Sequence, residues 1–320
     1  IKILAGVHQA DSGTMLLDGT PYRPANPRQA AARGIAVVFQ ELSLCNNLTV
    51  AENILALANV YDVYWFDAFG VLNVGPQPIP GAIEAVAALR QRGKQVFVLS
   101  NAASVSKPNM VKRFAGLGFD FAADEIVTSR DAVLDALVAY PRDFLWGLIG
   151  LDHSQEDLDA RGVRYLHQSA ADFHDAPDGY LFLATAHWDD AQQQRFLAAL
   201  TARPRPVILG NPDLIAPMPE HTSIEPGSYV LTLPDEHFAH VHVCGKPYPA
   251  IFEHAARRLA HFDPARTLMC GDTLHTDILG GNAFGVRTAL LTAHGFYRDL
   301  DYRHYIGDSG IVPDHILPRL

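Results

Sequence analysis

The side chains best suited to chemistry stand at the ends of short apolar segments. Asp67 follows the run YDVYWF, Ser100 follows VFVL, and Lys246 comes two residues after the segment HVHV. Asp272 follows TLMCG, and Asp277 comes five residues later. A carboxylate can attack phosphorus, a hydroxyl can hydrogen-bond a phosphoryl oxygen, and an ammonium group can neutralise phosphoryl charge. These residue types indicate phosphoryl transfer, with Asp67 as the nucleophile.

Each of these residues also has an ordinary structural explanation. An acid after a strand is more often a turn former than a nucleophile, and a serine there is usually a helix cap. A single lysine is usually a solvated surface group. The functional interpretation depends on all of them occurring in this order, each at the carboxyl end of an apolar strand.

The acids also predict a metal site. Asp67 and Asp272 offer hard oxygen ligands, which suit Mg²⁺ with retained water molecules. Without a cation, two such carboxylates would repel each other. We therefore expect Mg²⁺ as the cofactor.

Strands and helices alternate around these residues. The strand before Asp67 is followed by a helical pattern over 82–93, a buried strand over 96–99 and a helix over 107–117. This order implies right-handed parallel crossovers and a Rossmann-like, doubly wound α/β core. The polar strand ends of such a sheet meet at one edge, where ligands bind.

The middle of the chain predicts a separate domain. Residues 128–238 contain further strands and helices and form an inserted α/β cap, which divides the core into 58–127 and 239–320. We expect the main sheet to resume with the strand before Lys246.

A polar loop in this insert is a candidate for substrate binding. The stretch GNPDLIAP leaves a strand, and its Asn211 and Asp213 could line a pocket together with Asn101, which follows Ser100. The same loop could equally be an ordinary turn.

Composition excludes several classes of protein. The 320 residues suggest two or three domains, and a net charge of −10 argues against nucleic acid and anionic membranes as partners. Three widely separated cysteines, Cys45, Cys244 and Cys270, form no disulfide framework and suit a reducing cytoplasm. The sequence shows no membrane-spanning stretch and no signal peptide. The expected partner is a small phosphorylated metabolite, and a homodimer stays open.

Residues 1–57 carry a different set of motifs. The stretches SGTMLLDG, AVVFQELSL and NLTVAENI resemble the nucleotide-binding domain of a sugar-importing ABC transporter. The resemblance implies that Gln40 is the Q-loop glutamine. However, the chain contains no GxxxxGK[ST] phosphate cradle and no LSGGQ signature. We expect a truncated segment, part of a fusion or of a longer chain that begins here with Ile1, without ATP hydrolysis.

From about residue 60 to 320, the motifs FDAFGVL, LSN, GKP and GDTLHTDILGG resemble the haloacid-dehalogenase-like superfamily, and the insert with its GNPD loop resembles class IIA. The resemblance implies an α/β cap, Mg²⁺, an aspartyl-phosphate intermediate and phosphatase activity. By position, Asp67 would be nucleophile and metal ligand, and Phe69 would offer its backbone carbonyl to the metal. Asp272 would be the second metal carboxylate, supported by Asp277.

One residue departs from the family pattern. Phosphatases of this superfamily carry a second Asp two residues after the nucleophile as general acid and base, whereas this chain has Phe69. A phenyl ring cannot transfer a proton, and general acid–base catalysis contributes ~100- to 10,000-fold. Haloacid dehalogenases have Tyr at that place, but they need no Mg²⁺ site. His275 is a candidate surrogate proton carrier, although a loop histidine without a role is the simpler interpretation.

Three hypotheses follow. The first is a Mg²⁺-dependent phosphatase of a small metabolite, where the neighbouring importer-like segment favours a sugar or polyol phosphate. The second is an impaired protein that keeps its metal and phosphate sites without the acid lost at Phe69. The third is a fragment of a transporter ATPase subunit, which the missing phosphate cradle disfavours.

Overall fold

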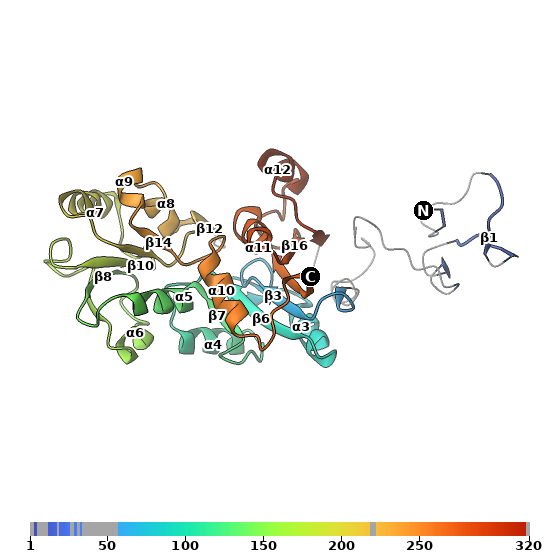
Figure 1. The fold of residues 1–320 in the computed structure, drawn as a ribbon, viewed down its shortest axis with the longest axis horizontal. Coiled ribbons are helices and arrows are strands. Elements are labelled where there is room, and N and C mark those ends of the chain that lie inside the picture. Colours follow the sequence, from blue (N-terminus) through green and yellow to red (C-terminus); the bar gives the residue numbers. More distant parts are fainter. Residues whose placement is uncertain are drawn as a thin grey trace. The chain divides into compact units, whose positions relative to one another are not determined.

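The computed structural model describes residues 57–217 and 222–317, with the short stretches 3–4, 12–17, 19–25, 29–30 and 33 (Figure 1). The chain divides into two compact units, Ile1–Ser43 and Leu44–Leu320. In the first unit, β1 (Leu16–Leu17) pairs antiparallel with β2 (Thr20–Pro21). The predicted Q-loop residue Gln40 lies outside the described residues, as does Cys45.

The second unit contains a six-stranded parallel main sheet in the order β17-β16-β15-β3-β6-β7. This sheet, together with its crossover helices, confirms the predicted Rossmann-like α/β class. The chain runs outward from β3 on one side and returns to its other side with β15, so β3 lies at the topological switch point. Ligands of open α/β sheets bind outside the strand ends at such a point. The strands are β3 (Val63–Phe66), β6 (Gln95–Ser100), β7 (Ile126–Thr128), β15 (Thr267–Gly271), β16 (Arg287–Leu291) and β17 (His315–Leu317).

Aromatic and β-branched side chains explain why β3 is central. All four residues of β3 are buried, which is typical of a parallel strand that is covered on both faces. On one face Trp65 stacks on Phe262 with ring centroids 5.8 Å apart and contacts Phe252 of α10 (Pro249–Arg257). On the other face Tyr64 contacts Tyr61 edge to face. The strand is thereby fixed from both sides.

A second sheet is also parallel and has the order β14-β11-β10-β8-β9. Alternate residues of β10 belong to two separate cores. Leu181 packs with α5 (Ser129–Ala136) and α6 (Glu156–Ala160), and Tyr180 and Phe182 pack with α7 (Asp190–Ala202). Figure 1 shows these helices on opposite faces of the sheet. The strands are β8 (Leu145–Ile149), β9 (Arg164–His167), β10 (Gly179–Phe182), β11 (Val207–Leu209) and β14 (Val241–Val243).

The strand before Lys246 differs from our expectation. We expect it in the main sheet, but β14 pairs parallel with β11, with Val207 opposite Val241. The second sheet therefore extends beyond residue 238, and the domain boundaries remain a prediction. Hydropathy alone does not reveal which sheet a short strand joins.

The remaining elements connect and cover the two sheets. Short hairpins are formed by β4 (Asn73–Val74) with β5 (Gln77–Pro78) and by β12 (Ile215–Pro217) with β13 (Thr222–Ile224). The α-helices not yet given are α3 (Ala82–Gln91), α4 (Lys107–Gly116), α8 (Pro226–Val230), α9 (Asp235–Phe238), α11 (Leu279–Phe284) and α12 (Tyr302–Ser309). Single turns of other helix types occupy Leu137–Ala139, Pro264–Arg266 and Leu274–Ile278.

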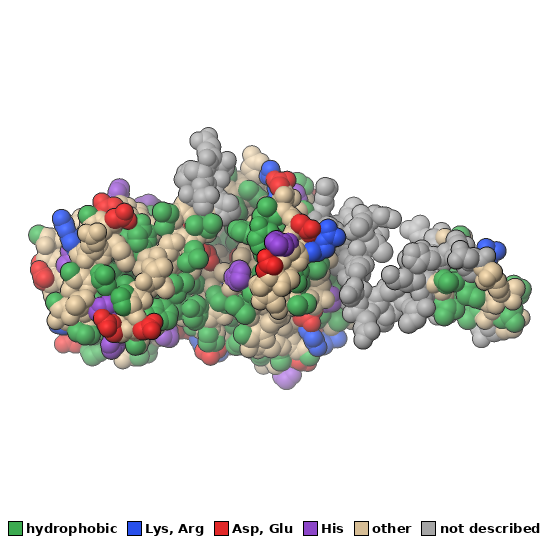
Figure 2. Space-filling view, turned by 90° about the horizontal axis from the view of Figure 1, so that it is seen from above, with side chains coloured by type: hydrophobic (Ala, Val, Ile, Leu, Met, Phe, Trp, Pro, Cys, Tyr) green, Lys and Arg blue, Asp and Glu red, His purple; other side chains and the backbone are tan. Residues whose placement is uncertain are grey.

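The surface adds two observations. Among the helices of the described ranges, none combines the length and the apolar character needed to cross a bilayer. On the face in Figure 2, Lys and Arg side chains of the described residues stand in small separate groups among acidic and apolar ones. Cys244 and Cys270 are buried free thiols.

Candidate active site

Asp67 lies directly after β3, at the switch point. Its backbone N–H donates to the carbonyl of Cys270, 2.9 Å away, which extends the pairing of β3 with β15 by one residue. The strand register places Phe66 opposite Cys270 and Val98, so the next residues of all three strands meet at one edge. The side-chain Oδ1 accepts a hydrogen bond of 2.8 Å from the N–H of Ala68. The carboxylate is thus held at the edge where ligands bind.

Lys246 reaches this edge from the loop after β14 and is only 2% exposed. Its Nζ donates to Asp277 Oδ1 at 2.6 Å, to Asp67 Oδ1 at 2.7 Å and to the carbonyl of Leu99 at 2.8 Å. These three acceptors match the three protons of an ammonium group. Burial alone would lower the pKa of Lys246, but the carboxylates of Asp277 and Asp67 outweigh burial and raise it. The lysine is therefore a permanent cation beside the predicted nucleophile.

Asp272 and Asp277 lie close to Asp67 and are both buried. Asp272 Oδ2 accepts from the N–H of Phe296 at 2.8 Å, and its Oδ1 accepts from the Thr273 hydroxyl at 3.1 Å. Asp277 Oδ2 accepts from the N–H of Thr273 at 3.2 Å. Burial, reinforced by the charge of Asp67, raises the pKa of Asp272 well above its usual value. Burial also raises the pKa of Asp277, to about 7, although Lys246 opposes that shift.

Glycine occupies two loop positions that approach Asp272, because a side chain at either position would collide with the Asp272 carboxyl group. A Cβ atom on Gly70 would lie 2.3 Å from Asp272 Oδ2, and one on Gly295 would lie 2.0 Å from it. Gly70 also has a φ of +76°, which favours glycine. Phe69, the residue before Gly70, is half-buried. Because Gly70 approaches Asp272 so closely, the loop that carries the Phe69 carbonyl passes directly against Asp272.

The donor set fits a divalent cation. Asp67, Asp272 and Asp277 each place one oxygen atom within 4.8 Å of the others. Three carboxyl groups share a single ammonium group, so the cluster carries an excess negative charge when all three are ionised, and burial, reinforced by the neighbouring carboxylates, raises the pKa of Asp272 and Asp277. Hard oxygen ligands with excess negative charge are what Mg²⁺ and Ca²⁺ prefer.

Ser100 and Asn101 follow β6, the neighbour of β3, and both are buried. The Ser100 hydroxyl oxygen accepts a long bond of 3.3 Å from the N–H of Ala102. The Asn101 side chain faces two other segments: its Oδ1 accepts from the N–H of Lys246, and its Nδ2 donates to the Lys246 carbonyl and to Asp213 Oδ1. The structure therefore brings Ser100 to the Asp67 edge and uses Asn101 as a bridge.

The predicted substrate loop lies at this bridge. Asp213 accepts from Asn101 at 2.8 Å, and its own N–H donates to Asn211 Oδ1 at 3.0 Å. The Asn211 Nδ2 donates to Glu225. Burial raises the pKa of Asp213 to about 6, partly offset by the Asn101 hydrogen bond. Asn211, Asp213 and Asn101 are thus bonded within the protein, and their role toward a substrate remains a prediction.

Sequence reasoning missed three contributors to this site. The backbone N–H of Phe296 and the adjacent Gly295 hold Asp272, and the carbonyl of Leu99 completes the shell of Lys246. The signal for Gly295 was a glycine shortly after the strand in TALLTAHG. Backbone donors and acceptors carry no sequence signal. The surrogate candidate His275 is exposed.

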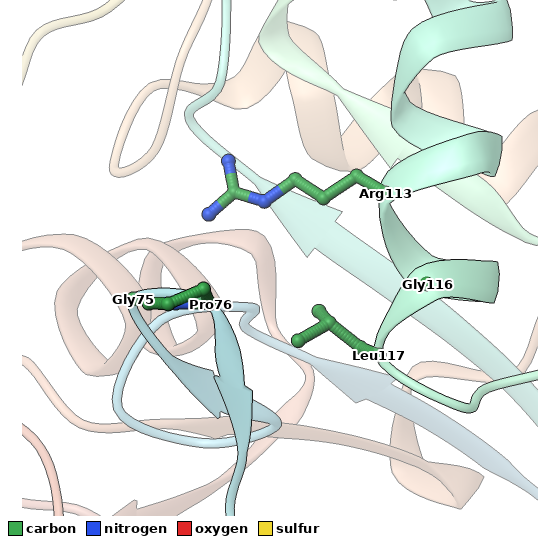
Figure 3. A pocket seen from close by; sticks show the side chains of 5 residues that line it. All are labelled: Gly75, Pro76, Arg113, Gly116 and Leu117. Carbon is green, nitrogen blue, oxygen red and sulfur yellow. The ribbon is translucent and has the colours of Figure 1, made fainter.

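A cavity of about 370 Å³ lies elsewhere, between α4 and the β4–β5 hairpin (Figure 3). Its lining residues are Gly75, Pro76, Arg113, Gly116 and Leu117, none of which belongs to the carboxylate cluster. Figure 3 shows Arg113 extending from α4 above the turn at Gly75 and Pro76. Its lining has a single charged group and no nucleophile, so this cavity offers no chemistry like that of the carboxylate cluster.

Comparison with known proteins gives consistent matches for the second unit. Residues 64–164 match the model of the "haloacid dehalogenase-like hydrolase" family, and residues 243–320 match a HAD-hydrolase-like family. Chronophin from Homo sapiens is 30% identical over 269 residues, which cover 80% of this chain and 89% of that protein.

Solved structures agree with this match. A possible sugar phosphatase of the HAD superfamily from Cytophaga hutchinsonii superposes with a TM-score of 0.72 at 28% identity, covering 82% of this chain and 95% of that one. Glycerol phosphate phosphatase from Mycobacterium tuberculosis, in complex with magnesium, has a TM-score of 0.66 at 24% identity, covering 81% and 75%. The second similarity supports the fold alone.

The N-terminal segment matches a different protein. A putative ribose/galactose/methyl galactoside import ATP-binding protein from Burkholderia cenocepacia is 54% identical over 54 residues. That stretch is 17% of this chain and 10% of the transporter protein. The match supports the resemblance of this segment in part, because it reaches only a small piece of that relative.

Proposed function

The chain belongs to the haloacid dehalogenase-like hydrolases, and from that premise we propose that it is a divalent-metal-dependent phosphatase of a small metabolite. A sugar or polyol phosphate is the substrate class we favour, because the N-terminal segment resembles part of a sugar importer. The observation that carries the proposal is Lys246, buried between Asp67 and Asp277 at the switch point of the main sheet. A fixed cation beside a carboxylate at that place suits phosphoryl transfer better than it suits a turn or a cap.

In the proposed reaction Asp67 attacks phosphorus. Its Oδ1 already accepts from Lys246 and Ala68, whereas none of the described residues donates a hydrogen bond to its Oδ2, which keeps its lone pairs for attack. The new Oδ2–P bond forms while the ester P–O bond breaks, and the leaving oxygen departs with the bonding pair. Water then attacks phosphorus and the Oδ2–P bond breaks, so that its electron pair restores the Asp67 carboxylate and phosphate is released. The proton that water loses passes to solvent, from which an alkoxide leaving group takes its proton.

The other residues position the phosphoryl group. Lys246 neutralises negative charge beside Asp67, and the Ser100 hydroxyl can donate to a phosphoryl oxygen. Asp67, Asp272 and the carbonyl of Phe69 would hold the divalent cation, with Asp277 in support because it is already bonded to Lys246 and Thr273. When bound, the cation would supply positive charge against the phosphoryl oxygens.

One observation favours a second candidate function. Phe69 stands where the proton donor for the leaving group would be, so the chain could instead bind phosphorylated metabolites and turn them over slowly. Leaving-group chemistry separates the two candidates. An aryl phosphate such as p-nitrophenyl phosphate releases a stable anion, whereas an alkyl phosphate needs a proton.

The test is phosphate release from a panel of sugar, polyol, nucleotide and aryl phosphates, with Mg²⁺ or with EDTA. We expect release that requires the metal and that Asp67→Asn abolishes. Asp175→Ala, an exposed carboxylate of the second sheet region, is the matched control and should keep full activity. Turnover of the aryl phosphate alone would favour the impaired function, and turnover retained by Asp67→Asn would exclude the proposed nucleophile.

A further inference from the structure

Asn101 is bonded to two segments that are far away in the sequence. Its Oδ1 accepts from the N–H of Lys246 at 2.7 Å, and its Nδ2 donates to the Lys246 carbonyl at 3.0 Å. The second Nδ2 proton goes to Asp213 Oδ1 at 2.8 Å. Both amide protons are therefore used, and Asn101 clamps both backbone polar groups of Lys246.

The GNPD loop, residues 210–213, is wedged beside the same turn. A Cβ atom on Gly245, the residue before Lys246, would lie 2.3 Å from Pro212 Cδ and 2.8 Å from Asn101 Oδ1. On its other side the loop abuts Gly227, whose Cβ atom would lie 2.1 Å from the Pro212 carbonyl oxygen. The loop thus fills the space between the start of α8 and the turn that carries the lysine.

The lysine has little tolerance for displacement. Its Nζ reaches three acceptors at 2.6–2.8 Å from three different elements. The Lys246 backbone is fixed by Asn101, and the Asn101 amide is in turn oriented by Asp213. A shift of about 1 Å in a positioned catalytic group can cost on the order of 100-fold in rate.

We infer that Asp213 is a positioning residue for Lys246, which it orients through Asn101, and that it is not a substrate ligand. This inference rests on the proposed phosphatase function and deepens it, because it couples the GNPD loop to the charge beside the nucleophile. The loop then affects every phosphate ester alike, because Lys246 faces the phosphoryl group that all substrates share.

Three variants test the inference with p-nitrophenyl phosphate and with one alkyl phosphate. Asp213→Ala removes the acceptor, and we expect kcat to fall about 10- to 100-fold on both substrates, with KM changed less than about threefold. Asp213→Asn keeps a carbonyl oxygen for Asn101 and should recover most of that loss. Asp175→Ala, with an exposed side chain, should match the wild type. Thermal melts of each variant check that the protein is folded.

Other outcomes would overturn the inference in distinguishable ways. A rise in KM with unchanged kcat would make Asp213 a substrate ligand. A loss confined to the alkyl phosphate, equal in Asp213→Ala and Asp213→Asn, would make it the proton carrier that Phe69 cannot be. Unchanged kinetics in Asp213→Ala would remove any role.

A crystallographic comparison keeps the test independent of the proposed function. If the wild type releases no phosphate, the phosphatase proposal fails, but the structures of the wild type and Asp213→Ala still decide the positioning role. We expect the Lys246 Nζ to Asp67 Oδ1 distance to lengthen beyond hydrogen-bond range in the variant. A distance that stays near 2.7 Å would contradict the inference.

Discussion

Replacing Lys246 by Met should destabilise the protein in a pH-dependent way. The substitution keeps the length of the side chain but removes the donor to Asp277 and Asp67, at 2.6 and 2.7 Å. Asp277 is fully buried, and removing one partner of a buried ion pair costs ~3–5 kcal/mol. We expect a loss of that size in the free energy of unfolding at pH 8.

The sign of the pH dependence follows from the carboxyl that remains. Burial, together with the charge of Asp67, already raises the pKa of Asp277 to about 7 in the presence of Lys246, against an ordinary value of about 4 in the unfolded chain. When the pKa of an acid is higher in the folded state than in the unfolded state, the free energy of unfolding falls as the pH rises from the unfolded-state pKa to the folded-state pKa. Without Lys246 the folded pKa lies higher still, so the variant continues to lose stability above pH 7. Because Asp277 of the wild type is still about half protonated at pH 7 and also loses a little stability above it, the deficit of the variant should grow by about 1 kcal/mol from pH 7 to pH 8.

Urea unfolding at pH 5.5, 7 and 8 in EDTA measures this deficit. Lys94→Met is the matched control, because Lys94 pairs with the half-exposed Asp62 and should cost less than ~1 kcal/mol. In an Asp277→Asn background, Lys246→Met should cost less, because no buried carboxylate is left uncompensated. An equal deficit at pH 5.5 and pH 8, or one below ~1 kcal/mol at pH 8, would refute the reasoning.

Two further predictions concern the acid and the metal. Phe69→Asp should raise kcat on an alkyl phosphate by ~100-fold or more and change kcat on p-nitrophenyl phosphate little, because only the alkyl leaving group needs a proton. Phe69→Ala controls for loss of the ring, and an equal gain in that variant would contradict the explanation. Mg²⁺ at 100 times its Kd should stabilise the wild type by ~2.7 kcal/mol, measured by thermal melting. Asp272→Asn should abolish this stabilisation, whereas Asp124→Asn, which changes an exposed carboxylate, should keep it. Equal Mg²⁺ stabilisation of all three proteins would place the ion elsewhere.

The core fold was predictable from local patterns. Apolar runs ending in polar residues identified β3, β6 and β15, and helical spacing identified α3 and α4 within a few residues. Parallel crossovers then required the strand ends to share an edge, so the proximity of Asp67 to Asp272 and Asp277 followed from the order of elements. The roles of these residues in catalysis stay predictions.

The bridge through Asn101 was not predictable in the same way. Its one side-chain amide links Asn101 to Asp213, which is 112 positions later in the chain, and to Lys246, which is 145 positions later. No hydropathy period carries that information. From the sequence, Asn101 and Asp213 are candidates for lining a substrate pocket, and the loop of Asp213 could equally be an ordinary turn. Hydrogen bonds give both groups partners inside the protein, and their role toward a substrate stays a prediction.

The position of β14 bears on how this protein can be recombined. Only Cys244 and Gly245 separate this strand from Lys246, so the second sheet and the lysine are nearly continuous in the chain. If the insert of this protein is moved into another core and the cut is made at residue 238, β14 stays behind with its own core. In the transferred insert, β11 then lacks its neighbour β14. The fully buried β11 would then present an unpaired edge, which invites aggregation. Crossovers placed after Val243 keep the sheet intact, and the donor insert must then bring its own support for the recipient's lysine.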